Sequence, residues 1–181
     1  MEAAAPGAGP DEAPARPLDE VDRIVADWRR ERPDLAVEPL EVFSRVTRLA
    51  RHLDRARRVA FTAHDLDTWE FDVLSALRRA GDPYELSPGA LVTATLVTSG
   101  TMTNRIDRLE GRGLVERHRS PDDRRGVVVR LTPGGRARVD AALTDLLTHE
   151  AGMLAAVSAD HRADLADLLR EAIAPFDTHP G

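Results

Sequence analysis

The chain has 181 residues, of which 42% are hydrophobic, and it contains no cysteine. This length suits one domain with a sizeable core, and the missing cysteines exclude disulfides, thiol redox sensing and cysteine-bound metal. The formal net charge is −6, yet between Thr98 and Arg138 ten arginines stand against five acidic residues. That local excess is compatible with a nucleic-acid partner. No apolar run approaches the length of a membrane span and no signal pattern opens the chain, so we expect a cytoplasmic protein.

The first part of the chain predicts a tail and two helices. Residues 1–17 are rich in Pro, Gly and Ala and low in large apolar residues, which predicts disorder. Apolar residues at helical spacing predict a helix over Leu18–Arg32, which Pro33 ends, and a longer one over Pro39–Phe61. The apolar stripe of the longer helix is typical of burial against partner helices.

The next segment predicts a helix and a short strand. Asp67 with Glu70 three residues later has the form of a capping box, and we expect the helix to end near Gly81. The extended stretch Tyr84–Leu86 is then available to add a strand to a neighbouring ribbon.

The stretch from Ser87 to Leu131 predicts two short helices followed by a two-stranded ribbon. Ser87-Pro88 is a helix start, and Thr98 or Ser99 caps a second helix that runs to about Gly111. We expect Gly111 and Gly113 to provide a left-handed stop. Residues 114–119 and 126–131 are strand-like runs, joined by the turn-forming sequence SPDDRR. This order of elements is a winged helix-turn-helix.

Two further helices complete a mainly α fold with a small β-wing. Thr132-Pro133 caps a long helix to about Ala151, and Ser158 caps a last one, whose apolar face continues until Pro175. The predicted organisation is an N-terminal tail (1–17), N-terminal helices for dimerisation and a ligand pocket (18–62), a winged helix-turn-helix (63–131), C-terminal dimerisation helices (132–176) and a tail (177–181). Because no other domain covers the apolar faces of the flanking helices, we expect a two-fold homodimer.

The outer face of the second short helix points to double-stranded DNA. Opposite Met102, Ile106 and Leu109 lie hydroxyl, amide and guanidinium side chains, which reach phosphates and base edges in a major groove. The arginines at the tip of the ribbon could enter an adjacent minor groove, with an aspartate holding one of them in position. The predicted DNA-binding residues are Ser99, Thr101, Thr103, Asn104, Arg105, Arg108, Arg119, Asp123, Arg124 and Arg125.

The segment TSGTMTNRIDRLEGRGLVERHRSPDDRRGVVVRLTPGGR resembles the MarR family of winged-helix transcriptional regulators. The DDRRG wing, followed by a strand and an LTPGGR helix start, is particularly specific to that family, and the resemblance extends over about residues 39–176. It implies a homodimer that binds a pseudo-palindromic operator, by default as a repressor, and that a small ligand releases. That ligand is often anionic or phenolic in this family.

Within the family the chain looks like the urate-responsive branch. The segments DWRRERPDL, EFDVLSALRRAG, PYELSPGAL and MTNRIDRLEGRGLVER all fit that branch. By this resemblance Trp28 stacks on the ligand, Asp72 contacts it or is displaced by it, and Arg105 pairs with its negative charge. Arg117 would link the ligand site to the DNA-binding lobe. A flat anionic heterocycle suits an aromatic face and a guanidinium fork.

Other functions have less support in the sequence. No nucleophile elbow or paired catalytic residues appear, so we expect neither an enzyme nor a bound cofactor. Six histidines are present but none pair at metal-ligand spacing, so no metal site is expected. The alternatives that stay open are the same fold responding to another aromatic or organic-acid ligand or to a metal, and a winged helix that contacts only protein.

Overall fold

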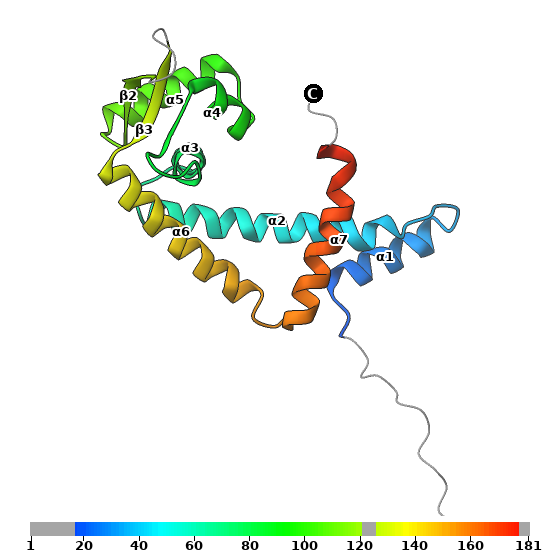
Figure 1. Ribbon diagram of the computed structural model, residues 1–181. Helices are drawn as coiled ribbons and strands as arrows, with labels where there is room; N and C mark the ends of the chain where they lie inside the picture. The colour runs from blue at the N-terminus through cyan, green and yellow to red at the C-terminus, as the bar shows by residue number, and fades with distance from the viewer. Residues whose placement is uncertain (1–16, 121–125, 178–181) are drawn as a thin grey trace, which may run out of the picture. The chain divides into compact units, whose positions relative to one another are not determined.

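The computed structural model describes residues 17–120 and 126–177, and it is mainly helical with one small antiparallel sheet (Figure 1). Tails are expected over residues 1–17 and 177–181, of which 1–16 and 178–181 lie outside the described residues, whereas residue 177 is the last residue of a helix. Its elements are α1 (Glu20–Glu31), α2 (Pro39–Thr62), α3 (Thr68–Arg79), β1 (Glu85–Leu86), α4 (Pro88–Thr95), α5 (Ser99–Gly111), β2 (Val115–Arg119), β3 (Val127–Leu131), α6 (Pro133–Met153) and α7 (Ala159–Asp177). This arrangement confirms the predicted fold class. In the described part of the chain no helix is both long and apolar enough to cross a bilayer.

The chain divides into two compact units, with the boundary inside α2 between Arg51 and His52. In the first unit α1 begins at Asp19, whose carboxylate accepts hydrogen bonds from the backbone N–H groups of Val21 and Asp22 at 2.7 and 3.0 Å. The small core of this unit consists of Val21, Val25 and Val37, with Leu40 packed against it. The unit therefore buries little apolar surface of its own.

An arginine on α2 reinforces this start of α1. Arg45 donates from Nε to Asp19 at 2.8 Å and from Nη2 to Asp22 at 2.7 Å. The hydrogen bond from Arg45 is the main cause that lowers the pKa of Asp19 to about 2. The first unit is thus held by an ion-pair cluster as well as by its valines.

The second unit has an extended hydrophobic core. The rings of Phe61 on α2 and Phe71 on α3 stack with centroids 4.0 Å apart. From α5 the buried residues are Met102, Ile106 and Leu109, as their spacing predicts. Side chains from α2, α3, α4, α5, α6 and the sheet form one continuous cluster. This core fixes α5 against α3 and α4.

The helix starts of the winged helix follow the predicted capping residues. The Ser87 hydroxyl accepts from the Ala90 N–H at 3.1 Å, and Thr98 Oγ1 accepts from the Thr101 N–H at 3.3 Å. Between the two helices Leu96 adopts a left-handed conformation with φ 52° and is 92% exposed. The tight turn between α4 and α5 therefore depends on a strained non-glycine residue.

The three strands run in the order β1–β3–β2, with both pairings antiparallel. In the hairpin Val115 pairs with Leu131 and Arg119 with Val127, and on the other side Glu85 pairs with Arg130. The prediction of a third strand before α4 is confirmed. Figure 1 shows this sheet beside α5.

The helix α5 ends at Gly111 as predicted, but the conformation of that glycine differs from the prediction, and so does the end of the last helix. Gly113 has the left-handed φ of 68°, but Gly111 is still helical, because the N–H groups of residues 113 and 114 close the turn onto Glu110 and Leu109. The last helix continues through Pro175 to Asp177. A proline this close to a helix end removes one donor from the final turn, so it does not force the helix to stop.

A buried carboxylate joins the start of α3 to the end of α5. Glu70 is 1% exposed, and its Oε2 accepts the Asp67 N–H at 2.9 Å, as the predicted capping box requires. The same oxygen accepts Nη1 of Arg112 at 2.5 Å, and Nη2 of Arg112 donates to the Asp65 carbonyl at 2.6 Å. One ion pair thus connects two helices of the winged helix.

The start of α6 packs directly on the backbone at the base of the wing. Thr132 Oγ1 accepts the Gly135 N–H at 2.9 Å, which caps the helix as predicted. A Cβ added at Gly135 would lie 2.0 Å from the Leu114 carbonyl oxygen. The contact between α6 and the sheet therefore requires glycine at this position.

Large apolar side chains stay exposed on several flanking helices. On α2 they include Val42, Phe43, Val46 and Leu49, and on α7 they include Leu165, Leu168, Leu169, Ile173 and Phe176. Leu168 is 62% exposed and Phe43 is 63% exposed. The described chain therefore covers these apolar faces only in part.

Candidate nucleic-acid interface and ligand pocket

The solvent side of α5 presents the short polar side chains that the sequence places there. Ser99, Thr101, Thr103 and Asn104 are exposed. Because Met102, Ile106 and Leu109 are buried, the opposite side of the helix faces solvent. The first turn, which contains Gly100, lets the backbone N–H groups of the helix start approach an anion closely. This surface suits contact with a phosphate backbone and base edges.

The two arginines of this helix lie over one indole ring. The Cζ atom of Arg105 is 5.4 Å from the ring centroid of Trp69, and the Cζ atom of Arg108 is 4.8 Å from it. Trp69 donates from Nε1 to Asp67 at 3.2 Å, and Arg108 lies 3.9 Å from the same carboxylate. The sequence predicts Trp69 as a core residue, and no sequence signal indicates its contact with α5.

Arg117 lies beside the carboxylates of α5. From β2 it donates hydrogen bonds to Asp107 and Glu110, and its backbone N–H donates to Glu110 at 3.3 Å. The hydrogen bond to Asp107 is the main cause that raises the pKa of Arg117. Arg117 thus neutralises acidic groups on a helix that would otherwise repel phosphate.

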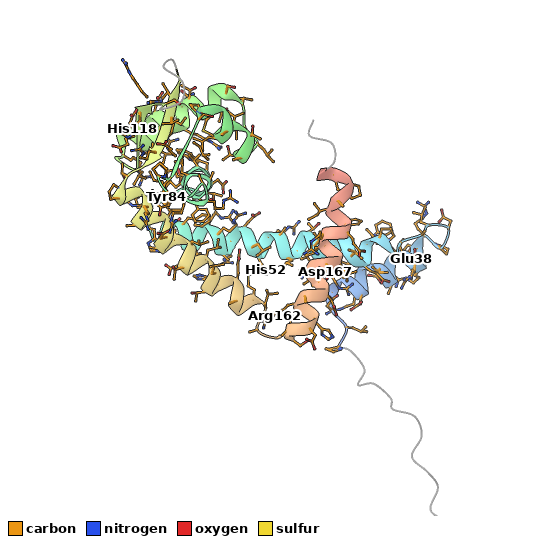
Figure 2. The ribbon with its side chains drawn as sticks, viewed as in Figure 1. Glu38, His52, Tyr84, His118, Arg162 and Asp167 are labelled. Atoms are coloured by element: carbon orange, nitrogen blue, oxygen red, sulfur yellow. The ribbon has the colours of Figure 1, made fainter. Side chains whose placement is uncertain are left out.

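The described part of the wing ends on either side of its tip. Arg119 is exposed at the end of β2, and the Ser120 N–H donates to the Gly126 carbonyl at 2.9 Å, which continues the hairpin. The predicted DNA-binding residues Asp123, Arg124 and Arg125 lie outside the described residues. His118, labelled in Figure 2, marks the strand that leads to them.

A pocket of about 410 Å³ opens beside Asp72 in the second unit. Side chains from α2, α3 and α6 and the turn after α4 line it, among them Arg57, Asp72, Ser75, Arg78, Leu96 and Leu143. Arg57 Nη2 lies 3.8 Å from Asp72 Oδ1, which is an ion pair but too long for a hydrogen bond. The Nε atom of Arg57 is buried and has no hydrogen-bond partner among the described residues. The pocket therefore offers an unused donor beside a carboxylate.

The other predicted ligand residues lie elsewhere. Arg105 is stacked on Trp69 and Arg117 is paired with α5, and neither lines this pocket. Trp28 belongs to the first unit and is 48% exposed. Arg57 was missed because it is one of several arginines on α2, and spacing alone does not distinguish it from the others.

Histidines and carboxylates do not form a metal centre in the described part of the chain, where no group of three or more suitable ligands is found. His64 pairs with Asp145 at 2.7 Å, and His118 with Glu116 at 2.8 Å. Each of these two histidines contacts a single carboxylate, which is not the arrangement of a metal centre.

Comparisons with known proteins agree with the geometry. Residues 64–126 match the model of the MarR family. The chain is 39% identical to the HTH-type transcriptional regulator PecS of Dickeya dadantii over 150 residues, which are 83% of this chain and 90% of PecS. A mutant MarR from E. coli, solved in complex with operator DNA, superposes with a TM-score of 0.64 at 28% identity, covering 76% of this chain and 96% of MarR. BpsR of Bordetella bronchiseptica, whose DNA binding is regulated by 6-hydroxynicotinic acid, superposes with a TM-score of 0.54 at 30% identity, covering 70% and 91%.

Proposed function

Because the chain belongs to the MarR family of winged-helix transcriptional regulators, we propose that it is a homodimeric repressor of a pseudo-palindromic operator, which a small anionic ligand releases from the DNA. As a member of this family it is a DNA-binding transcriptional regulator. The observation that supports the finer proposal is the exposed polar side of α5, held by a buried core on its other side.

For the DNA contact we propose that α5 enters the major groove. Its hydroxyl and amide side chains and its two arginines then reach phosphates and base edges, while Arg119 and the wing arginines 124 and 125 contact the flanking backbone or minor groove. The acidic net charge does not oppose this, since the arginines are concentrated in this part of the sequence.

For the assembly we propose a two-fold dimer built from the helices that flank the winged helix. The uncovered apolar side chains of α2 and α7 support this, because isolated patches of this size are seldom left in water. To bind two half-sites, such a dimer would have to place its two copies of α5 roughly 34–36 Å apart, one turn of B-DNA. The residue ranges 18–62 and 132–176 are the proposed dimerisation segments.

For the effector we propose a small aromatic anion bound in the pocket beside Arg57 and Asp72. The buried Nε–H of Arg57 has no acceptor among the described residues, and a ligand carboxylate or enolate oxygen would supply one. The same negative charge would repel Asp72, which is on α3, so ligand binding would favour a different position of that helix. Support comes from BpsR, the 30% identical structure whose DNA binding a hydroxylated aromatic acid regulates.

Urate is the specific candidate that the resemblance suggests, with Trp28, Asp72, Arg105 and Arg117 as its contacts. The two versions of the site share Asp72 but differ in their other residues, because Arg57 lines the pocket whereas Trp28, Arg105 and Arg117 do not. A ligand that needs Arg57 supports the pocket, and one that needs Trp28 and Arg105 supports the urate-type site.

The regulator proposal is tested by titrating the dimer against the DNA that flanks its own gene at two salt concentrations. Tight binding to a palindrome that weakens steeply with salt is expected, because arginines displace counterions from phosphate. The absence of specific binding at either salt would overturn the proposal and favour a winged helix that contacts protein.

The effector proposal is tested by calorimetry without DNA, with urate and 6-hydroxynicotinic acid as separate probes. Arg57→Met should abolish binding of an effector that occupies the pocket, and Arg105→Met, outside the pocket, is the matched control. Equal loss in both variants, or loss only in Arg105→Met, contradicts the pocket assignment.

A further inference from the structure

We propose that Trp69 is a positioning residue for operator binding, because its indole ring holds the guanidinium groups of Arg105 and Arg108 in orientations from which they reach DNA. The inference rests on the proposed role of α5 as the DNA-reading helix. It adds a residue of α3, outside that helix and outside the wing, to the groups that determine affinity.

The first argument is the geometry of the cluster. Arg105 and Arg108 are three residues apart, so they project from the same side of α5. Both Cζ atoms lie within 5.4 Å of the centroid of the Trp69 ring, a separation at which cation–π attraction operates. One aromatic ring therefore restrains two long side chains that would otherwise sample many rotamers in solvent.

The second argument is that the contact with the ring leaves the guanidinium donors available. The π face attracts the positive charge and does not take up an N–H group as an oxygen acceptor would. Within the described residues neither guanidinium is in hydrogen-bond contact with a carboxylate, since the Arg108–Asp67 separation is 3.9 Å. A hydrogen-bonded salt bridge would have occupied these donors, as it does for Arg117, whereas the Arg108–Asp67 ion pair is too long for a hydrogen bond.

The third argument is that the ring itself is fixed. Trp69 is the second residue of α3, packs against the hydrophobic core, and donates from Nε1 to Asp67 at 3.2 Å. The next residue, Glu70, is buried and paired with Arg112. The indole is thus held at a fixed place beside the recognition helix.

A ring that served only the core would have a different consequence. Its removal would lower the free energy of unfolding, and any loss of DNA affinity would not depend on Arg105 or Arg108. A positioning ring acts through these two side chains, so its effect should vanish once they are gone.

The test is a double-mutant cycle with operator affinity measured at one fixed salt concentration. We expect Trp69→Leu to weaken binding about tenfold and Trp69→Phe, which keeps an aromatic face, to weaken it only about twofold. In a background with both Arg105→Met and Arg108→Met, Trp69→Leu should cause no further loss. Tyr84→Leu is the matched control, because the Tyr84 ring contacts the guanidinium groups of Arg78 and Arg136 and neither arginine of α5. It should leave operator affinity near that of the wild type.

Fluorescence gives a second measurement that does not require a Trp69 variant to fold. In Trp28→Phe the emission comes from Trp69 alone, because the chain contains two tryptophans. Operator addition should change that emission with the same midpoint as the binding curve. The reason is that phosphate binds the guanidinium groups next to the Trp69 ring and so changes the surroundings of the ring.

Any one of three outcomes would overturn the inference. Trp69→Leu could bind operator with wild-type affinity, or it could cause an equal loss in the background that carries Arg105→Met and Arg108→Met. The third is a Trp69 emission that does not change at saturating operator. Failure of the wild-type protein to bind any operator would instead overturn the proposed function, so the two failures are distinguishable.

Discussion

The two units of this chain are stabilised in different ways. The second unit has a continuous core that extends from Ala60 on α2 to Leu146 on α6, and this core holds α5 in place. The first unit buries three valines and relies on the Arg45 ion pairs, while Trp28 and Phe43 remain exposed. The difference supports the proposal that α5 is a preformed surface for DNA, whereas the exposed apolar faces of the flanking helices are completed by a second chain.

The largest expected effect is on the proposed assembly. Leu168→Glu places a charge on the exposed apolar face of α7 and should convert the dimer to a monomer, because an unpaired carboxylate is costly to bury. Loss of the second recognition helix should then weaken operator binding roughly a hundredfold or more. Sedimentation velocity and DNA titration measure the two effects.

Ala163→Glu is the matched control for this substitution. It adds the same carboxylate to α7, on the other side of the helix and also at an exposed position. A dimer that persists in Leu168→Glu, or that is lost equally in both variants, would show that this face is not the interface.

A smaller effect is expected inside the second unit, where packing rather than assembly is tested. Gly135→Ala forces a Cβ to within 2.0 Å of the Leu114 carbonyl oxygen and should lower the free energy of unfolding by about 3 kcal/mol. Chemical denaturation measures this change.

Gly134→Ala is the control for helix propensity and chain entropy. Its added Cβ would meet only the Thr132 hydroxyl, at 3.7 Å. Because both glycines are in the first turn of α6, a similar loss of stability in the two variants would contradict the steric argument.

The smallest effect concerns the ion pairs of the first unit. The pKa of Asp19 lies at about 2, below its ordinary value of 3.8, so the charged carboxylate favours the folded state. This contribution is complete above pH 4 or so and is lost as the pH falls through about 2. Arg45→Gln should return the pKa of Asp19 toward its ordinary value, as measured by NMR titration of the side-chain carboxyl.

Arg48→Gln is the control, because Arg48 pairs with Glu20 at 2.7 Å rather than with Asp19. An Asp19 pKa that stays near 2 in Arg45→Gln would show that the N–H groups of the helix start, and not the guanidinium, lower it.

Sequence patterns predicted the parts of the fold that depend on neighbouring residues. The caps at Ser87 and Thr98, the buried side of α5 and the third strand are each determined within a few positions, and all were confirmed. The expectation that Gly111 is left-handed was wrong. One left-handed glycine is enough to end the helix, and Gly113 takes that conformation.

The candidate site was less predictable, because its contacts join distant segments. Trp69 meets Arg108 from another helix, and Arg57 meets Asp72 across the pocket. Sequence spacing does not relate residues of two different helices, so these pairs could not be predicted from it. The polar face of α5 was predictable, whereas the residues that orient its arginines were not.

The Glu70–Arg112 ion pair links the start of α3 to the end of α5, so we expect the two helices to move together. Separating them would leave a charge uncompensated in the interior, at a cost of roughly 3–5 kcal/mol, so tilting both helices together is easier than sliding one past the other. If the proposed ligand displaces Asp72, two residues beyond Glu70, we therefore expect α5 to move together with α3. In the proposed mechanism the position of α3 would then set the position of α5 on DNA.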